Sequence, residues 1–415
     1  MTAPPLRRWI FLLAALTATT ALSIDMSLPA QPLIAREFGV SADIAQLTLS
    51  VFLLGFAAGQ LVVGYLSDAL GRRRVLLGGM ALFTLAGLLC ALSPTMGTLL
   101  AARLLQGAGA ASGPVLARAM VRDTQPLSSA ARILATMMTA LAVAPMIAPS
   151  IGGVMLHALG WHSIFFAHAA FGLGLGALVW VVLKETLPPE RRTRFAPRTI
   201  LASLRQFFGT PGTRVPTVLI GLSFGGQFAF ISDSPFVLIE HYHVAAARYG
   251  LYFGATAIAL MLGAASGSRL LRVRPPSQIV LLGTSLLGAG GLLTALSVRS
   301  ERFGPLGLVV PMLVYFLGVG LTGPPSTAIA MEPVPRIAGT ASAFIGGLQM
   351  LSGALSGWLV TRIGGSDPRV LSRAVAVLGT SAAVLAFTAR PGRSRPAPAV
   401  APGPPAPSPA AAVVE

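Results

Sequence analysis

The sequence predicts an all-α integral membrane protein whose twelve transmembrane helices form two halves of six. Composition is the first observation behind this prediction: 54% of the 415 residues are hydrophobic and only 10% are charged, whereas soluble domains are nearer a quarter charged. The second is a succession of apolar segments of about 20 residues, the length that crosses a bilayer. The third is that basic residues gather between alternate segments, as cytoplasmic loops do.

Twelve apolar segments meet the length requirement, and one long polar interruption divides them into six and six. The predicted spans are residues 9–31, 46–66, 75–93, 97–118, 133–157, 163–183, 215–239, 249–270, 277–297, 304–331, 338–361 and 371–389. Residues 184–214 predict a cytoplasmic linker, so the N-terminal half is 1–183 and the C-terminal half is 215–389. Residues 390–415 are rich in Pro and Ala without periodicity, which predicts a disordered tail.

The first segment needs its own argument, because Arg7 and Arg8 before an apolar run resemble a signal peptide. No small-x-small cleavage site follows the run, and many similar segments come after it. We therefore interpret residues 9–31 as the first membrane helix.

The basic residues predict the orientation of the chain. With the N-terminus on the cytoplasmic side, 22 of the 30 Lys and Arg residues fall in cytoplasmic segments and seven on the opposite side. The remaining one, Arg103, lies within a span. This asymmetry agrees with an even number of helices and with both termini in the cytoplasm, in the inner (plasma) membrane.

Other function classes are disfavoured by the same composition. The net charge of +17 is scattered in short clusters between apolar runs, without a basic face that carries aromatics, so nucleic-acid binding is not expected. The one cysteine, Cys90, lies in an apolar run, and the five histidines lack a metal-binding spacing. No nucleophile–base or metal constellation is present, so neither an enzyme nor a cofactor is predicted.

The stretch GYLSDALGRRRVLL after the second span predicts a conformational latch on the cytoplasmic side. Gly64 and Gly71 would permit close backbone approach or a tight turn. Asp68 and Arg72 are four residues apart and can pair on one helix face. The alternative is a hairpin whose arginines only fix the topology. Three more residues, at the cytoplasmic end of the fourth span, are expected to join the latch: Arg118, Arg122 and Asp123.

Several motifs carry a resemblance to a known family. GYLSDALGRRR resembles the signature between helices 2 and 3 of the major facilitator superfamily, RLLQGAGAA resembles its helix 4 motif, and APMIAPSIGG resembles the helix 5 motif of antiporters. More narrowly, IDMSLPAQP, FLLGFAAGQLVVGYLSD, VRD, SPF and AGTASAFIGGLQ are similar to segments of the Bcr/CflA drug-resistance subfamily of drug:proton antiporters. The resemblance covers nearly the whole chain, and it implies the major facilitator fold in a functional monomer.

The sequence departs from the family pattern at three places. Ala148 stands where the broader antiporter motif has glycine, and His162 stands where an arginine is usual. The second-half counterpart of the latch, GSRLLRVRPPS, lacks the aspartate. The last departure suggests that the cytoplasmic latch is asymmetric.

Three ionisable residues lie alone inside predicted spans: Asp25, Arg103 and Asp233. Each is about six residues from the outer end of its span, about 9 Å deep at 1.5 Å per residue. A charge inside a membrane usually faces the bundle interior and finds a partner. We therefore expect Asp25 and Arg103 to meet and to form a proton-coupled switch with the substrate. The alternative is a fixed interhelical ion pair.

Two further residue sets complete the candidate site. Gln106, one turn from Arg103, is expected to orient the arginine or to contact substrate. Asp233 either contributes to the substrate and proton site or lies in a watery outer vestibule. The helix 5 motif contains Pro145, Pro149, Gly152 and Gly153, which favour a kink with close packing; a passive kink is the alternative.

The predicted function is secondary active export of small-molecule drugs or toxic metabolites in exchange for protons. Its partners would be that small molecule, protons and the lipid bilayer, and its energy source the proton gradient. A proton-coupled importer of a small nutrient or sugar is the first alternative. A non-transporting membrane sensor or scaffold is the second, although no soluble signalling domain is apparent.

Overall fold

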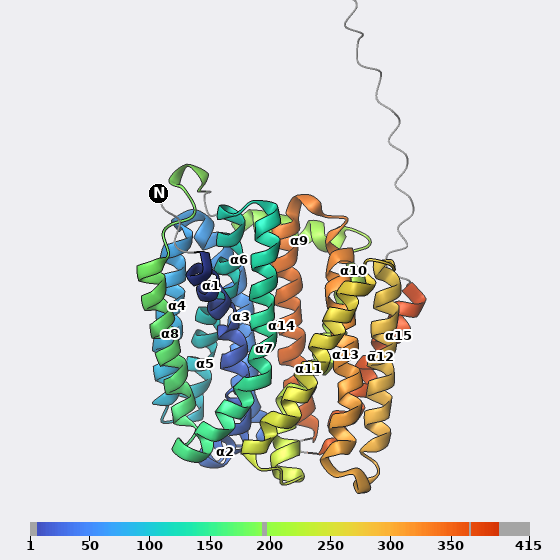
Figure 1. The fold of residues 1–415 in the computed structure, drawn as a ribbon. Coiled ribbons are helices and arrows are strands. Elements are labelled where there is room, and N and C mark those ends of the chain that lie inside the picture. Colours follow the sequence, from blue (N-terminus) through green and yellow to red (C-terminus); the bar gives the residue numbers. More distant parts are fainter. Residues whose placement is uncertain (1–5, 193–196, 365–366, 390–415) are drawn as a thin grey trace, which may run out of the picture.

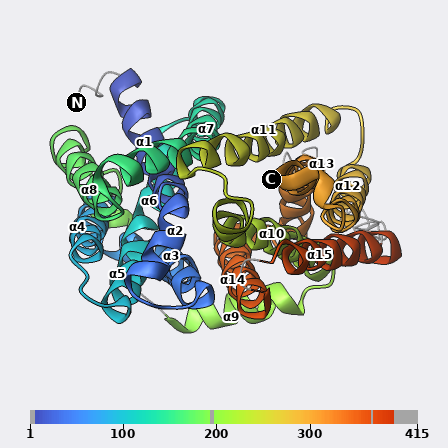
Figure 2. The same ribbon diagram turned by 90° about the horizontal axis from the view of Figure 1, so that it is seen from below.

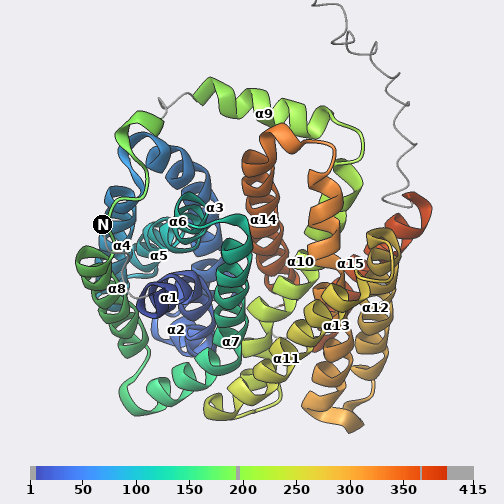
Figure 3. The ribbon, with the colours of Figure 1, turned by 45° about the horizontal axis from the view of Figure 1, so that its top comes forward.

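The computed structural model describes residues 6–192, 197–364 and 367–389, and every regular element in these ranges is helical (Figure 1). The predicted tail, residues 390–415, lies outside the described residues, as does part of the predicted linker. The helices form two groups that stand side by side, one before and one after the linker helix α9 (Pro197–Gly209). Figure 3 shows α9 running across one end of both groups.

The first group contains the elements before the linker. They are α1 (Leu6–Asp25), the short η1 (Leu28–Ala30), α2 (Gln31–Glu37), α3 (Ala42–Leu70), α4 (Arg72–Ala91), α5 (Met96–Ala110), α6 (Ser112–Thr124), α7 (Leu127–Leu159) and α8 (His162–Val182). A short 3₁₀ turn, η2 (Pro189–Arg191), follows in the linker.

The second group contains the elements after the linker. They are α10 (Arg214–Pro235), the π-helical turn η3 (Phe236–His241), α11 (Ala246–Leu270), α12 (Pro276–Ser297), η4 (Glu301–Phe303), α13 (Gly304–Met331), η5 (Pro335–Ile337), α14 (Ala338–Gly364) and α15 (Pro368–Ala389).

Eleven helical spans in the described residues are long and apolar enough to cross a membrane. The predicted fourth span is the twelfth, because it is divided into α5 and α6 with only Ala111 between them. Ala111 keeps helical dihedrals, and its N–H donates to the carbonyl of Gly107. The two pieces therefore continue in one direction and cross together, so the predicted twelve-helix fold is confirmed.

The first span differs from the prediction in length and shape. It extends to Glu37 rather than residue 31, and it is interrupted after Asp25 by a turn and by η1. Pro29 lies within η1 and Pro32 near the start of α2. A proline cannot donate a backbone hydrogen bond, so two prolines within four residues explain why the α-helix stops and restarts here.

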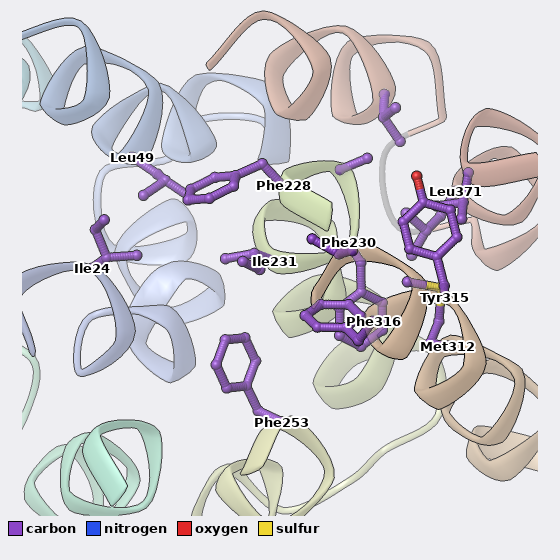
Figure 4. Packing of buried hydrophobic residues seen from close by; sticks show 14 of the residues in the cluster. Ile24, Leu49, Phe228, Phe230, Ile231, Phe253, Met312, Tyr315, Phe316 and Leu371 are labelled. Atoms are coloured by element: carbon purple, nitrogen blue, oxygen red, sulfur yellow. The ribbon is translucent and has the colours of Figure 1, made fainter. Parts of the chain in front are cut away.

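The two groups meet along two helix pairs, α7 with α11 and α3 with α14 (Figure 2). Buried apolar residues from both groups share one cluster at the centre. Figure 4 shows Ile24 and Leu49 of the first group facing Phe228, Ile231 and Phe253 of the second. The end of α1 is thus part of the contact between the halves.

Two ion pairs also join the groups on the side opposite α9. Arg36 donates to Glu240 at 3.0 Å, which connects α2 with η3. Arg362 donates to Asp43 at 3.3 Å, which connects α14 with α3. In this conformation the halves are therefore tied together at the end of the molecule that is remote from the linker.

Candidate functional site

Asp25 is the last residue of α1 and lies where the first span breaks. Its side chain is buried, with 4% of its surface exposed. It makes no ion pair or side-chain hydrogen bond with any described residue. The 3₁₀ turn η1, which follows Asp25 after two residues, packs against α10 and α11 of the other half. The sequence thus places a carboxylate without a polar side-chain partner at the contact between the two halves.

Arg103 is held by the first half alone. Its guanidinium donates to the carbonyls of Thr48 and Ser23, at 3.2 and 3.4 Å, and to Gln106 Oε1 at 2.7 Å. It also stacks on two aromatic rings, those of Phe52 and Phe165. Arg103 and Gln106 are completely buried. The expected contact between these two residues is present, as the hydrogen bond from Nη1 to Oε1.

The expected meeting of Asp25 and Arg103 is absent from this conformation. The two residues form no ion pair in the described part of the chain: Nε and Nη1 of Arg103 donate to carbonyl and amide oxygens, and Nη2 has no partner there. The guanidinium of Arg103 nevertheless lies near the level of Asp25, since it donates to the carbonyl of Ser23, two residues before Asp25. The first span continues beyond the break to Glu37, so more residues follow Asp25 within the span than the six expected.

Asp233 is buried between α10 and α14, with 1% of its surface exposed. Its Oδ1 accepts a hydrogen bond of 3.3 Å from the Thr361 hydroxyl, while Oδ2 lacks a partner among the described residues. This carboxyl group therefore lies in the packed contact of two helices rather than in an open, watery vestibule.

Two polar residues near these charges were not singled out from the sequence. His168 on α8 is 2% exposed, near the Leu22 backbone, and neither ring nitrogen completes a well-formed hydrogen bond with the described residues. Tyr249 on α11 is fully buried, and its hydroxyl lies 2.9 Å from that of Ser234. A single histidine or tyrosine in an apolar span has no spacing that could reveal its surroundings.

The predicted latch residues Asp68, Arg72 and Asp123 come together on the α9 side. Arg72 pairs with Asp68 at 2.5 Å and with Asp123 at 3.0 Å. It also donates to Ser67 Oγ at 2.6 Å. Gly71 has φ of +98°, a conformation that residues with a Cβ rarely adopt, so glycine permits the turn between α3 and α4.

Glu185, just after α8, is a member of this cluster that sequence reasoning missed. Its carboxylate accepts hydrogen bonds from the backbone N–H groups of Arg72 and Arg73, at 2.8 and 3.2 Å. The first N–H groups of a helix lack partners within that helix, and a carboxylate there is also favoured by the helix dipole. Glu185 therefore caps α4 and ties the linker to the latch.

Three other predicted latch residues lie apart from these contacts. Arg118 donates to the carbonyl of Pro114 in its own helix, at 2.9 Å. Arg122 is exposed and forms no ion pair with Asp68 or Asp123 in the described residues. Gly64 has open space where a Cβ would stand, and α3 continues through it. The close approach expected at Gly64 is therefore wrong, because the helix does not turn until Gly71.

Helix α7 contains the whole helix 5 motif and passes through Pro145 and Pro149 without a break. Its two glycines contact different halves. A Cβ on Gly152 would collide with the carbonyl of Met26, next to Asp25, and one on Gly153 would lie 2.5 Å from the carbonyl of Ala246. Gly152 thus packs against the break in the first span, and Gly153 against the start of α11.

Comparison with known proteins identifies the class of molecule to which this fold and these buried charges belong. The family model of the Major Facilitator Superfamily matches residues 13–357. The chain therefore belongs to the Major Facilitator Superfamily, whose members are transporters rather than enzymes.

Individual relatives show which members of the superfamily this chain is similar to. The chain is 36% identical over 84% of its length to the MFS-type transporter YdgK of Bacillus subtilis (strain 168), covering 87% of that protein. It is 30% identical over 89% of its length to the multidrug resistance protein MdtL of Escherichia coli O45:K1, covering 92%. It is 28% identical over 93% of its length to a bicyclomycin resistance protein homolog of Haemophilus influenzae, covering 98%. These names agree with the predicted Bcr/CflA resemblance, which is confirmed.

Solved structures agree with the fold. A structure described as the D-xylose-proton symporter superposes with a TM-score of 0.73 at 16% identity, covering 91% of this chain and 97% of the symporter. At this level of identity the similarity concerns the fold alone.

Proposed function

We propose that this transporter exports small apolar or cationic toxic compounds from the cytoplasm in exchange for protons. The observation that carries the proposal is the position of Asp25, a buried carboxylate without a polar side-chain partner at the contact between the halves. A carboxylate in this position can bind either a proton or a substrate, and the two compete. The names of relatives at 28–30% identity support drugs as the substrate class.

The exchange follows from this competition. A proton that reaches Asp25 from the outer side neutralises the carboxylate and releases the exported compound there. When the halves close on the outer side, the proton leaves to the cytoplasm and the carboxylate becomes available to the next substrate molecule. A membrane potential of 100 mV supplies about 2.3 kcal/mol for each charge moved, which assists export against a gradient.

The α9 side would be cytoplasmic in this proposal, and the side with the Arg36–Glu240 pair would face outward. The basic loops support this orientation in the inner membrane. The conformation described here then corresponds to a carrier that is closed toward the outside, because both ion pairs between the halves lie on that side.

Everted membrane vesicles test the direction of transport. A drug-hypersensitive host that expresses the chain is first screened against bicyclomycin, amphenicols, cationic dyes and sulfonamides. The compound with the largest rise in resistance is then offered to vesicles with an acidic interior. Proton-driven accumulation inside the vesicles is expected. Release of the compound together with protons would instead indicate an importer and overturn the proposal.

A further inference from the structure

Tyr249, near the start of α11, carries a fully buried hydroxyl in the half opposite to Asp25. A buried tyrosine hydroxyl normally has a hydrogen-bond partner, and here that partner is Ser234 on α10, at 2.9 Å. Either hydroxyl can be the donor. Ser234 is buried as well, so this bond is sheltered from water.

Helix α7 contacts the backbone next to Asp25 and the backbone next to Tyr249 within a single turn. Gly152 abuts the carbonyl of Met26, the residue after Asp25, and Ser150 abuts Gly250, the residue after Tyr249. Ser150 and Gly152 are separated by about 3 Å along the helix axis. The two backbones therefore meet one turn of α7 from two sides, and η1, which follows Asp25, packs directly against α11.

An ionised Asp25 needs hydrogen-bond donors, since a buried charge without them is costly. Arg103 does not serve in this conformation: its Nε and Nη1 donate to Thr48, Ser23 and Gln106, and it forms no ion pair with Asp25, although its Nη2 lacks a partner among the described residues. Tyr249 is a donor from the other half, and it lies on α11, the helix that packs against η1 just after Asp25. The Tyr249 hydroxyl thus has two alternative hydrogen-bond acceptors, the Ser234 hydroxyl and the Asp25 carboxylate.

We propose that Tyr249 is a positioning residue that links the ionisation of Asp25 to the contact between the halves. Its hydroxyl bonds to Ser234 while Asp25 is protonated and donates to the carboxylate after Asp25 has released its proton. The second bond ties α1 to α11, so an empty, unprotonated carrier stays closed on the side opposite α9. The inference rests on the role of Asp25 in the proposed function.

Other titratable groups on the surrounding helices must be separated from Asp25 in any pH experiment. They are Arg103 on α5, His168 and His162 on α8, Asp233 on α10 and the exposed Arg248 on α11, together with residues near the ends of α6 and α7: Arg118, Arg122, Asp123, Arg132 and His157. The Asp25→Asn variant removes only the carboxylate and therefore assigns its share of the pH dependence.

Distance measurement between two spin labels tests the inference without a known substrate. Labels are attached at Leu33→Cys on α2 and Leu306→Cys on α13, two exposed positions on the side opposite α9, in a Cys90→Ala background. The full chain is reconstituted in lipid nanodiscs, and the fraction of open, long-distance molecules is measured by double electron–electron resonance between pH 5 and pH 9. The open fraction is expected to fall as the pH rises.

Four single variants and one double variant have different expected effects on the ratio of open to closed molecules. Tyr249→Phe should raise the open-to-closed ratio at high pH about tenfold, the effect of losing a hydrogen bond to a charged group. Ser234→Ala should lower that ratio, because the tyrosine loses its competing acceptor. Asp25→Asn should remove the pH dependence, and adding Tyr249→Phe to it should change nothing further. Tyr315→Phe, at a buried tyrosine whose hydroxyl has no partner in the described residues, is the matched control and should behave as the unmodified chain.

Two results would separate the inference from the proposed function. If Asp25→Asn leaves the pH dependence intact, the proton-coupling role of Asp25 fails, and the role of Tyr249 fails with it. If Asp25→Asn removes the pH dependence but Tyr249→Phe matches Tyr315→Phe, proton coupling stands and the Tyr249 inference is overturned. An equal effect of Tyr249→Phe with and without Asp25→Asn would also overturn it.

Discussion

At the residue scale, the two buried charged residues of the first half, Arg103 and Asp25, differ in their surroundings. Arg103 donates through Nε and Nη1 to Ser23, Thr48 and Gln106, all in the first half, and so belongs to the packing of one half. Asp25 lacks such partners and lies where the halves touch. An ionisable residue inside a membrane costs about 2.5–3.5 kcal/mol on insertion scales. The free-energy cost of placing Asp25 in the membrane is not offset by side-chain contacts, which is consistent with a functional role. The contacts of Arg103, in contrast, also stabilise the structure.

Arg103→Lys is expected to reduce transport at least about tenfold, because an ammonium lacks the planar fork that bonds several acceptors at once. The measurement is proton-driven drug uptake into everted vesicles, normalised to the amount of folded protein. Arg373→Lys, at an exposed arginine of α15, is the control and should leave uptake unchanged. Full activity of Arg103→Lys would show that charge alone is needed at this position.

The residues that the sequence could reveal were those with an unusual chemical character for their surroundings. Asp25, Arg103 and Asp233 are charges in apolar segments, and Asp68 and Arg72 have helical spacing, so each was identifiable. Their partners were not. Backbone carbonyls such as those of Ser23 and Thr48 occur at every residue, and Glu185 contacts Arg72 across 113 positions of the sequence.

At the element scale, helix α4 depends on a cap from the linker. Glu185→Ala is expected to destabilise the protein by about 1 kcal/mol, the usual effect of losing an N-terminal cap. Thermal unfolding in detergent measures this effect. Glu190→Ala, at an exposed glutamate of the same linker, should have no effect on the unfolding midpoint. Equal unfolding midpoints for Glu185→Ala and Glu190→Ala would show that Glu185 does not stabilise the protein by capping α4.

Helix α7 depends on its glycines for contact with both halves. Gly152→Ala is expected to impair folding or transport, since the added Cβ would collide with the Met26 carbonyl. Gly174→Ala on α8, where a Cβ meets nothing within 4 Å, should be neutral. Membrane abundance and vesicle uptake are the two measurements. Normal values of both for Gly152→Ala would mean that the close approach of α1 and α7 is dispensable.

Hydropathy was sufficient to predict where most of the membrane-spanning helices lie, but not where helices are interrupted or extended. Apolar length predicted the spans, because a membrane helix must cover the hydrocarbon core. It did not predict the interruption after Asp25 or the division of the fourth span at Ala111, since local backbone geometry leaves no trace in mean hydropathy. The extension of the first span to Glu37 was also missed, because α2 carries polar residues that hydropathy assigns to a loop.

At the scale of the whole molecule, the halves are held together on the side opposite α9 by packing and by two ion pairs. Arg36→Glu is expected to favour opening on the side opposite α9 by at most about fivefold, because exposed ion pairs contribute about 1 kcal/mol or less. Adding Glu240→Arg should restore the original ratio. The labels at Leu33→Cys and Leu306→Cys serve for this measurement as well. Failure of the double variant to recover would mean that the pair does not hold the halves together.

Proton-coupled export by this transporter depends most on Asp25 as the carrier of the exchanged proton. The direct measurement is drug resistance of a hypersensitive host that expresses Asp25→Asn, with the folded variant shown to be present in the membrane. If Asp25 carries the exchanged proton, resistance is abolished while the protein folds normally, because the amide can neither bind nor release a proton. Resistance equal to that conferred by the unmodified chain would contradict it.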